Sequence, residues 1–328
     1  MRIATAVVTA LVIICFHHPQ RATAQRSHHG GERHAVSGKA ATHCYDPSDA
    51  DEIRLWSGNA PGAVGNDPCR DIPFLQVFRV AGTERGNTPA ILVIPGGGYD
   101  RLSDEKEQAP VAEYFSRNFH VTTFVLYYRL VQADGTYRYP VPMWDGQRAF
   151  KLIRYLAQQY GIDPKRTGVF GFSAGGHLAS TLALHAATDF DLPVHDSVDA
   201  MNGRPDILGL GYPVISMDPA QFASPTSLSH LLYGYRGHEL DSLEHYLSGQ
   251  DNVTRNTPPV FLFESMDDQR ISPQNSVMFA QALHVSNIPA GIHLFSHGVH
   301  GAGLAVGIPE EDAWPELFHR WLASQGFI

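Results

Sequence analysis

The chain lacks the features that would mark a membrane protein, a metal protein or a nucleic-acid-binding protein. Its 328 residues include only three cysteines, no Lys/Arg-rich run and a formal charge of −9. Metal sites are commonly signalled by Cys-x-x-Cys or His-Glu-x-x-His spacing, which is absent, and nucleic-acid surfaces need clustered basic residues. The sequence therefore predicts no metal site and no nucleic-acid partner.

An apolar run is present at the N-terminus, but it is short. Met1-Arg2 gives a positive start, residues 3–16 are almost entirely apolar, and Ala22-Thr23-Ala24 is a small-x-small site. A bilayer-spanning helix takes roughly 20 apolar residues, so a membrane anchor is the weaker alternative. Residues 1–24 are predicted to be a signal peptide cleaved near Ala24, which makes the mature protein secreted or periplasmic and free of the membrane.

Cleavage would remove Cys15 and leave Cys44 and Cys69 as an even pair in an oxidising compartment. A disulfide between them is the expectation, and two free thiols are the alternative. Around Cys44, residues 25–51 are rich in His, Gly, Ser and Ala and show no hydrophobic period. We expect them to form a flexible leader before a single catalytic domain over 52–328.

Apolar segments at the spacing of strands alternating with helices follow from residue 52 onward. This pattern predicts the α/β class: one domain with a mostly parallel central sheet and helices on both faces. The expected strands are 75–80, 90–94, 121–130, 167–172, 206–214, 260–264 and 291–295, and the expected helices are 145–160, 176–187 and 310–324. The polar and aromatic excursion over 215–258 could form a cap or one wall of a cleft.

The pentapeptide Gly171-Phe172-Ser173-Ala174-Gly175 lies between an expected strand and an expected helix. It fits the Gly-x-Ser-x-Gly elbow, in which a sharp turn exposes a serine hydroxyl at the carboxyl edge of the sheet. Its glycines are needed where a side chain would collide with the neighbouring strand or helix. Ser173 is therefore the candidate nucleophile, and a structural turn that happens to contain serine is the alternative.

A serine nucleophile needs a histidine base, and the base needs a carboxylate that holds it. Both follow Ser173 in the order acid, then histidine, each just after an expected strand. Asp267 and Asp268 follow 260–264, and His297 and His300 follow 291–295. Spacing alone does not decide which acid and which histidine of these two pairs are catalytic.

An oxyanion formed during attack on a carbonyl must be met by fixed N–H donors. One candidate is Ala174, which follows the nucleophile, and others lie in Pro95-Gly96-Gly97-Gly98, just after the strand over 90–94. Glycine lets backbone N–H groups approach substrate closely. A plain flexible turn is the alternative, since the Lys-Ser/Thr of a phosphate-binding loop is absent.

With these features placed, the chain resembles the α/β-hydrolase fold and, within it, the acetyl xylan esterase and bacterial feruloyl-esterase-like (BD-FAE-like) branch. The resemblance covers roughly 53–328 and is carried by the stretches 94–99, 126–130, 171–179, 212–216, 267–268, 275–276 and 297–301.

The resemblance implies that the second acid and the second histidine are catalytic, so that Ser173, Asp268 and His300 form the triad. Two departures concern the acid loop. Glu264 stands where relatives usually carry His or Gly, and Ser272-Pro273 displaces the usual proline by one residue, so we expect this loop to be placed differently.

The resemblance also implies that Gly97, Gly98 and Ala174 donate N–H groups to the oxyanion and that Tyr99 lies beside the pocket as a substrate-binding residue. No metal or organic cofactor is needed for such a mechanism.

The function expected from these residues and this resemblance is that of a secreted serine carboxylester hydrolase acting through an acyl-enzyme. Acetyl groups on plant cell-wall polysaccharide, xylan above all, are the leading substrate. Feruloyl or other short-chain esters are an alternative. A prolyl-oligopeptidase-like peptidase is another, although residues 1–51 are too few for its propeller domain. A hydrolase-fold binding protein would be expected to have lost a member of the triad. The oligomeric state stays open.

Overall fold

A parallel sheet organises the computed structural model, which describes residues 43–81 and 87–328. The strand order is β1-β2-β4-β3-β5-β6-β7-β8. Pairing is parallel from β4 to β8 across the sheet and antiparallel at β1 and β2. The strands are β1 Glu52–Arg54, β2 Phe74–Phe78, β3 Thr88–Ile94, β4 Thr122–Tyr127, β5 Ile162–Phe172, β6 Leu208–Gly211, β7 Val260–Ser265 and β8 Ala290–Phe295. The predicted α/β class is confirmed.

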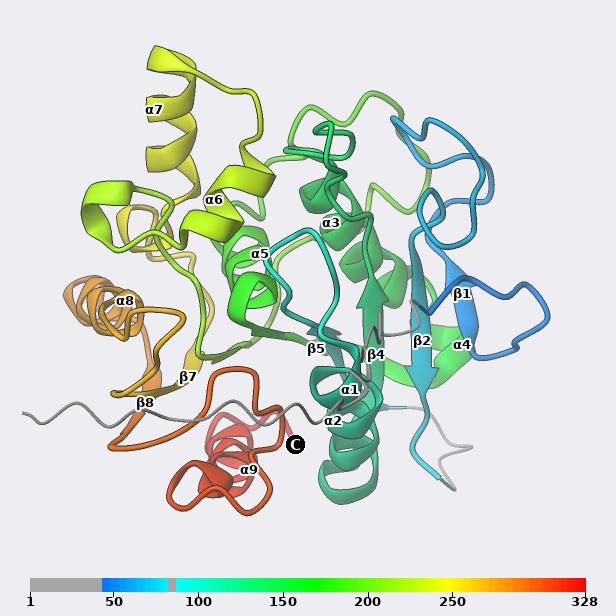
Figure 1. The fold of residues 1–328 in the computed structure, drawn as a ribbon. Coiled ribbons are helices and arrows are strands. Elements are labelled where there is room, and N and C mark those ends of the chain that lie inside the picture. The colour runs from blue at the N-terminus through cyan, green and yellow to red at the C-terminus, as the bar shows by residue number, and fades with distance from the viewer. Residues whose placement is uncertain (1–42, 82–86) are drawn as a thin grey trace, which may run out of the picture. The chain divides into compact units, whose positions relative to one another are not determined.

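Helices cover both faces of this sheet (Figure 1). They are α1 Asp104–Glu107, α2 Ala109–Tyr114, α3 Val141–Tyr155, α4 Ala157–Tyr160, α5 Ser173–Leu184, α6 Pro225–Leu231, α7 Gly237–Leu247, α8 Gln274–Val285 and α9 Trp314–Ser324. None of the helices in the described ranges has the length and apolar character that a membrane crossing requires.

Alternation along the buried strands produces two separate cores. In β3, Leu92 and Ile94 join the core under α3, α5 and α8, while Ile91 and Val93 join the core under α2 and α9. Successive side chains of a strand point to opposite faces, so a strand covered on both sides must be apolar throughout. This requirement explains the continuous apolar run that predicted the strand.

The expected elements all occur, with shifted ends. The helix expected over 145–160 begins at Val141 and is interrupted at Leu156, where α4 takes over. Proline at residue 142 is tolerated because the first turn of a helix has no N–H bond to lose. The helix expected from 176 begins at Ser173 itself. Strand β1 and helices α1, α2, α6, α7 and α8 were not predicted.

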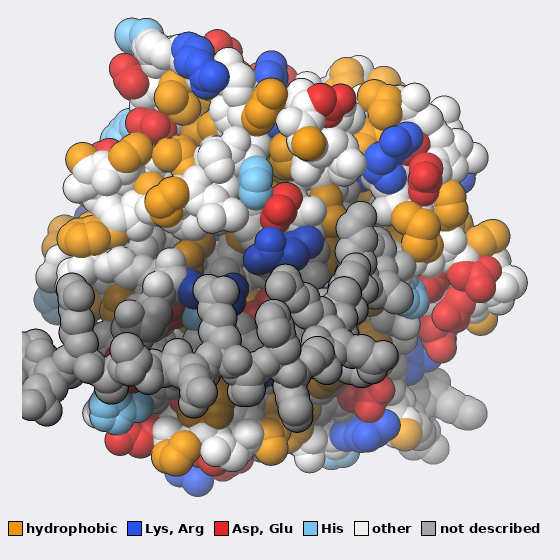
Figure 2. Space-filling model, in the orientation of Figure 1, with side chains coloured by type: hydrophobic (Ala, Val, Ile, Leu, Met, Phe, Trp, Pro, Cys, Tyr) orange, Lys and Arg blue, Asp and Glu red, His pale blue; other side chains and the backbone are white. Residues whose placement is uncertain are grey.

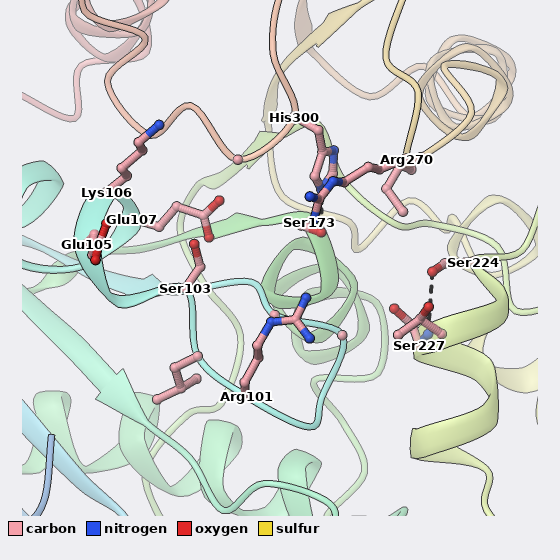
Figure 3. Close-up of a pocket in the computed structure, with 16 residues that line it drawn as sticks. Arg101, Ser103, Glu105, Lys106, Glu107, Ser173, Ser224, Ser227, Arg270 and His300 are labelled. Atoms are coloured by element: carbon pink, nitrogen blue, oxygen red, sulfur yellow. Dashed lines mark hydrogen bonds between the residues drawn. The ribbon is translucent and has the colours of Figure 1, made fainter. Parts of the chain in front are cut away.

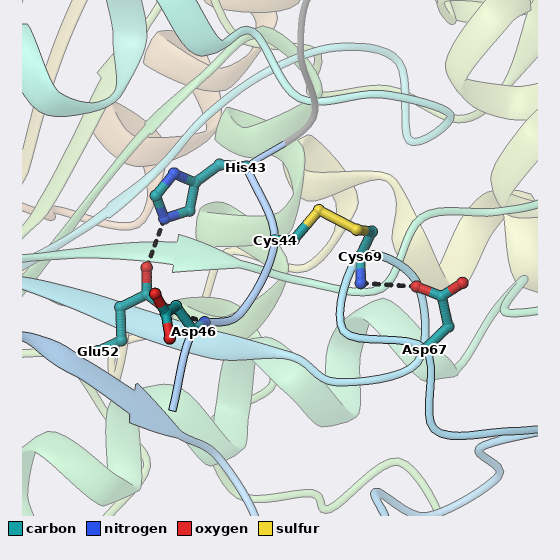
Figure 4. Close-up of a disulfide and its surroundings, with 6 residues drawn as sticks. All are labelled: His43, Cys44, Asp46, Glu52, Asp67 and Cys69. Carbon is teal, nitrogen blue, oxygen red and sulfur yellow. Dashed lines mark hydrogen bonds and ion pairs between the residues drawn. A yellow bond between two sulfur atoms is a disulfide. The ribbon is translucent and has the colours of Figure 1, made fainter. Parts of the chain in front are cut away.

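Part of the expected leader is attached to the body. The disulfide Cys44–Cys69 is present, and the carboxylate of Glu52 at the start of β1 contacts the His43 ring and accepts a bond from the N–H of Asp46 at 2.7 Å (Figure 4). Within the described residues the ordered chain therefore starts before residue 52. The predicted signal peptide and residues 25–42 of the predicted leader lie outside the described residues.

Candidate active site

Ser173 sits on the sharp turn between β5 and α5. Its φ of +52° lies in the left-handed region, which is uncommon for a residue with a side chain and is typical of strained functional positions. The flanking glycines permit this turn: a Cβ on Gly171 would lie 2.2 Å from the carbonyl oxygen of Gly175, and one on Gly175 would lie 2.2 Å from that of Ile94. The steric role expected for both glycines is the one observed.

His300 bridges Ser173 and Asp268. Its Nε2 lies 2.9 Å from the Ser173 hydroxyl oxygen, and its Nδ1 lies 2.6 Å from a carboxylate oxygen of Asp268. With the hydrogen on Nδ1, the ring donates to Asp268 and presents an acceptor to the serine hydroxyl. The three residues follow β8, β5 and β7, whose carboxyl ends share one edge of the sheet.

The neighbouring candidates form a second pair that does not include Ser173. His297 Nδ1 lies 2.9 Å from Asp267, and the side chains of these two residues are 79% and 43% exposed. The corresponding fractions for His300 and Asp268 are 11% and 1%. The structure thus separates the two possibilities that sequence spacing left open: the inner pair contacts the serine, and the outer pair faces solvent.

Asp268 is held as an anion despite its burial. Burial raises the pKa of its carboxyl, but the hydrogen bond and charge of His300, together with backbone hydrogen bonds from Ile271 and Arg270, outweigh this effect, and the net pKa lies below the usual value. The N–H groups of Arg270 and Ile271 donate to the same carboxylate at 2.7 and 3.0 Å. A carboxylate fixed by several donors can orient an imidazole without taking up its proton.

The glycine loop after β3 faces the same space. Gly97 and Gly98 have φ values of +122° and +66°, and both line the cavity that contains Ser173 and His300. The carbonyl oxygen of Gly97 accepts a hydrogen bond from the N–H of Arg101, and the carbonyl oxygen of Gly98 accepts one from the His230 ring. The N–H groups of both glycines, in contrast, have no hydrogen-bond acceptor among residues 43–81 and 87–328. These two N–H groups are therefore available to a ligand.

Ala174 follows the nucleophile at the start of α5 and is fully buried. Backbone N–H groups in the first turn of a helix have no partner within the helix and attract negative charge. Ala174 is thus placed as expected for an oxyanion donor.

The expectation for Tyr99 has to be corrected. Its side chain is completely buried and does not line the cavity. With a φ of +71°, it turns inward, and its hydroxyl lies 2.6 Å from Nδ1 of His177. The other nitrogen of that ring bonds the carbonyl of Leu247 at 2.9 Å, so Tyr99 donates to a neutral His177, whose pKa burial lowers to about 4. Tyr99 packs behind the site and is not among the residues that line the cavity.

The cavity in front of Ser173 has a volume of about 680 Å³ and is lined mostly by residues with polar side chains (Figure 3). The excursion over 215–258 forms one wall of it, through α6 and the residues before that helix. The lining residues are Gly97, Gly98, Arg101, Leu102, Ser103, Glu105, Lys106, Glu107, Ser173, Ser224, Thr226, Ser227, Arg270, Ile271, His300 and Gly301.

Glu107 is a buried carboxylate in this lining that sequence reasoning missed. One of its oxygens accepts the N–H of Gly96 and the other accepts the hydroxyl of Tyr212, each at 2.8 Å. Burial raises the pKa of Glu107, and these hydrogen bonds and the charge of His300 oppose that effect. The surrounding sequence Asp-Glu-Lys-Glu is typical of an exposed helix, which concealed this role.

Glu264, which stands where relatives usually carry His or Gly, lies inside the protein. This side chain is fully buried behind Asp268, where it accepts hydrogen bonds from the N–H of Ser265 and the hydroxyl of Ser276 at 2.9 and 3.0 Å. Burial, together with the charge of Asp268, raises the pKa of Glu264 to about 8. The unusual residue therefore leaves Asp268 in contact with His300, and the expected displacement of the acid loop does not separate the two.

Asn275 connects the acid side of the site to the excursion. Its side-chain oxygen accepts the N–H groups of Ile215 and Ser216, both at 2.9 Å, and its amide donates to the carbonyl of Phe222 at 3.0 Å. A buried amide satisfied in this way fixes the start of the excursion against α8.

Comparison with known proteins finds a family model and solved structures that match this chain. The model of the BD-FAE family matches residues 75–283. Among solved structures, an acetyl ester-xyloside bifunctional hydrolase from Caldicellulosiruptor lactoaceticus is 36% identical with a TM-score of 0.75, over 84% of this chain and 97% of that one.

Two curated relatives are longer proteins. The chain is 34% identical to endo-1,4-beta-xylanase B of Butyrivibrio fibrisolvens over 66% of its own length and 32% of the relative. It is 28% identical to an acetylxylan esterase of Xylanibacter ruminicola, over 72% of this chain and 45% of that protein. The chain thus spans less than half the length of either relative.

Proposed function

Because the chain belongs to the BD-FAE family of the α/β-hydrolase fold, we propose that it is a serine carboxylester hydrolase that removes acetyl groups from xylan through an acyl-enzyme. The observation that carries this proposal is the position of His300, with Nε2 at 2.9 Å from Ser173 and Nδ1 at 2.6 Å from Asp268. A base within hydrogen-bond reach of a serine on an elbow is the arrangement that acyl transfer requires.

In the first half of the proposed reaction, Ser173 attacks the ester carbonyl while its hydroxyl proton passes to Nε2 of His300. The negative charge formed on the carbonyl oxygen is met by the N–H groups of Gly97, Gly98 and Ala174. Loss of one such donor raises an enzyme's barrier by roughly 3 to 4 kcal/mol. His300 then gives the proton to the leaving sugar oxygen, the bond from carbon to that oxygen breaks, and acetyl-Ser173 remains.

In the second half, His300 takes a proton from water, and the resulting nucleophile attacks acetyl-Ser173. The oxyanion of the second tetrahedral intermediate accepts hydrogen bonds from the same N–H donors. Its collapse returns the proton to Ser173 and releases acetic acid. Asp268 keeps its negative charge throughout, because its role is to orient and stabilise the protonated imidazole.

The choice of acetyl and xylan rests on the names of the relatives and on the polar lining of the cavity. Serine and threonine side chains from the excursion, Ser224, Thr226 and Ser227, line the wall that a sugar would contact. Hydroxyl-rich walls of this kind suit a hydrophilic leaving group, since each sugar hydroxyl can exchange a water for a protein partner.

We further propose that the chain is exported and cleaved near Ala24. The Cys44–Cys69 disulfide supports this assignment, because disulfides persist mainly in oxidising compartments. N-terminal sequencing of the protein recovered outside the cytoplasm should start near Gln25. Recovery of an intact Met1 from that fraction would contradict export by cleavage.

The substrate is tested by product analysis on acetylated xylan, acetylated pectin and feruloylated arabinoxylan, with Ser173→Ala as the blank. The proposal predicts acetate from xylan with wild type alone. Ferulate as the main product would favour the feruloyl esterase alternative, and no released acid from any polymer would contradict a polysaccharide substrate.

A further inference from the structure

Positive side chains surround the cavity, although the chain as a whole carries a formal charge of −9. Arg101, Lys106 and Arg270 all line it and are exposed. Figure 2 shows Lys and Arg side chains together near the middle of the face drawn there. Glu105 is the exposed acid of the lining, whereas the Glu107 carboxylate is buried. The mouth therefore carries more positive than negative charge.

Arg101 is positioned by the glycine loop. Its N–H donates to the carbonyl of Gly97 at 3.3 Å, and a Cβ on Gly97 would lie 2.2 Å from the carbonyl oxygen of Arg101. The tight turn that presents the glycine N–H groups to the cavity thus also places Arg101 at its rim.

Arg270 is positioned by the acid loop on the other side. Its N–H donates to the Asp268 carboxylate at 2.7 Å, so the turn that holds Asp268 also places Arg270. In Figure 3, Arg101 and Arg270 extend toward the space in front of Ser173 from different sides. Both guanidinium groups are therefore built on the same turns as the reacting groups.

These two arginines are poorly neutralised. Within the described ranges the Arg270 guanidinium has no hydrogen-bond or ion-pair partner, and Arg101 contacts only the adjacent Asp100, at 3.3 Å with both side chains partly exposed. In contrast, Arg129, Arg148 and Arg154 make ion pairs of 2.6 to 2.9 Å. A planar guanidinium without a partner is suited to bind a carboxylate through two parallel hydrogen bonds.

We propose that Arg101 and Arg270 bind the carboxylate of a uronic acid unit close to the scissile ester, so that the preferred substrate is an acetylated glycan that carries uronic acids. This inference rests on the proposed esterase function and names the substrate class of the same site. Ser173 is 8% exposed, whereas the two arginines lie at the exposed rim of the cavity. The guanidinium groups therefore contact the glycan, and the acyl group lies deeper, beside the glycine loop.

The test compares acetate release from acetylated glucuronoxylan with release from the same polymer after its carboxyl groups have been converted to methyl esters. At low salt, wild-type kcat/KM should be about three- to tenfold higher on the free-acid polymer, the size expected for two exposed ion pairs, and the ratio should shrink as salt is added. Arg101→Gln/Arg270→Gln should bring the ratio close to one.

Arg255→Gln is the matched control, because Arg255 is exposed, lies outside the cavity lining and carries the same charge. It should keep the wild-type ratio. Equal wild-type rates on the two polymers, or a ratio lowered as much by Arg255→Gln as by the double variant, would overturn the inference and leave the esterase function standing. No acetate from either polymer would contradict the proposed xylan substrate and the inference with it.

Discussion

Tyr212 donates its hydroxyl hydrogen to the buried carboxylate of Glu107 over 2.8 Å, and this bond joins the two halves of the candidate active site. The second oxygen of Glu107 holds the N–H of Gly96 in the glycine loop. The Tyr212 oxygen in turn accepts a hydrogen bond from the N–H of Gly303, a residue just after His300 in the chain. The centre of the His300 ring lies 4.9 Å from the centre of the Tyr212 ring. Glu107 thereby links the oxyanion donors to the base.

Replacing Glu107 should lower catalysis more than it lowers substrate binding. Glu107→Ala leaves the N–H of Gly96 and the hydroxyl of Tyr212 without a buried partner, which costs about 1 to 3 kcal/mol for each group. We expect kcat on p-nitrophenyl acetate to fall by about tenfold or more with little change in KM. Glu107→Gln, which keeps an acceptor for Gly96, should restore most of the rate.

The control is Glu113→Ala, which removes an exposed acid from α2 and should match wild type. A loss in Glu107→Ala that appears only as a lower melting temperature, with kcat intact, would contradict a positioning role.

The two neighbouring acids provide a matched pair for testing the orienting carboxylate. Asp268→Asn should lower kcat by about 10⁴-fold, because an amide favours the wrong imidazole tautomer. Asp267→Asn should stay within about twofold, since the Asp267 carboxylate bonds the exposed His297 ring and the N–H of Gly298, and surface interactions of this kind contribute little. Steady-state kinetics on p-nitrophenyl acetate decides the matter, and the reverse order of effects would assign the role to the outer pair.

Glu264 should make the stability of the fold depend on pH. Burial raises its pKa to about 8, so the folded protein keeps this proton where an unfolded chain, with an ordinary carboxyl pKa, has released it. The resulting stabilisation is complete below the ordinary carboxyl range and is lost as pH rises through about 8. Between about pH 5 and pH 8, the unfolding free energy of wild type should therefore fall by about 2 to 4 kcal/mol relative to Glu264→Gln.

Urea unfolding at several pH values measures this difference. The exposed Glu239→Gln on α7 should follow wild type at every pH. If Glu264→Gln also follows wild type in parallel, Glu264 is ionised in the folded protein and the expectation fails.

The disulfide should stabilise the fold without contributing to catalysis. It closes a loop with a sequence separation of 25, and removing it through Cys44→Ser/Cys69→Ser should lower the unfolding free energy by about 3 kcal/mol on the chain-entropy model. The urea midpoint should drop while kcat/KM of the folded protein is retained. If the urea midpoint of the double variant equals that of the wild type under oxidising conditions, the disulfide does not stabilise the fold.

Sequence patterns were informative where one physical requirement governs a stretch of chain. Residues 90–94 of strand β3 are covered on both faces and must be apolar at each position, and the turn at Ser173 admits only glycine at 171 and 175. Patterns of this kind are local and can be read from one sequence. The three residues of β1, in contrast, are too few to show a period.

The remaining features of the site depend on contacts between distant segments. Tyr212, one of the hydrogen-bond partners of Glu107, is 105 residues away, and nothing near Glu107 in sequence indicates burial. Tyr99 was misassigned because its place beside the glycine loop does not reveal the direction of its side chain, which a positive φ turns inward. Only the fold shows that Arg101 and Arg270 share a cavity.

The most direct test of the central claim is covalent labelling with a fluorophosphonate, which reacts with activated serines, followed by peptide mapping. We predict one label on the peptide that contains Ser173, formed more slowly when excess substrate is present during labelling and absent from a folded Ser173→Ala variant. A label on another residue, or labelling and esterase activity that persist in Ser173→Ala, would contradict the assignment of Ser173 as the nucleophile.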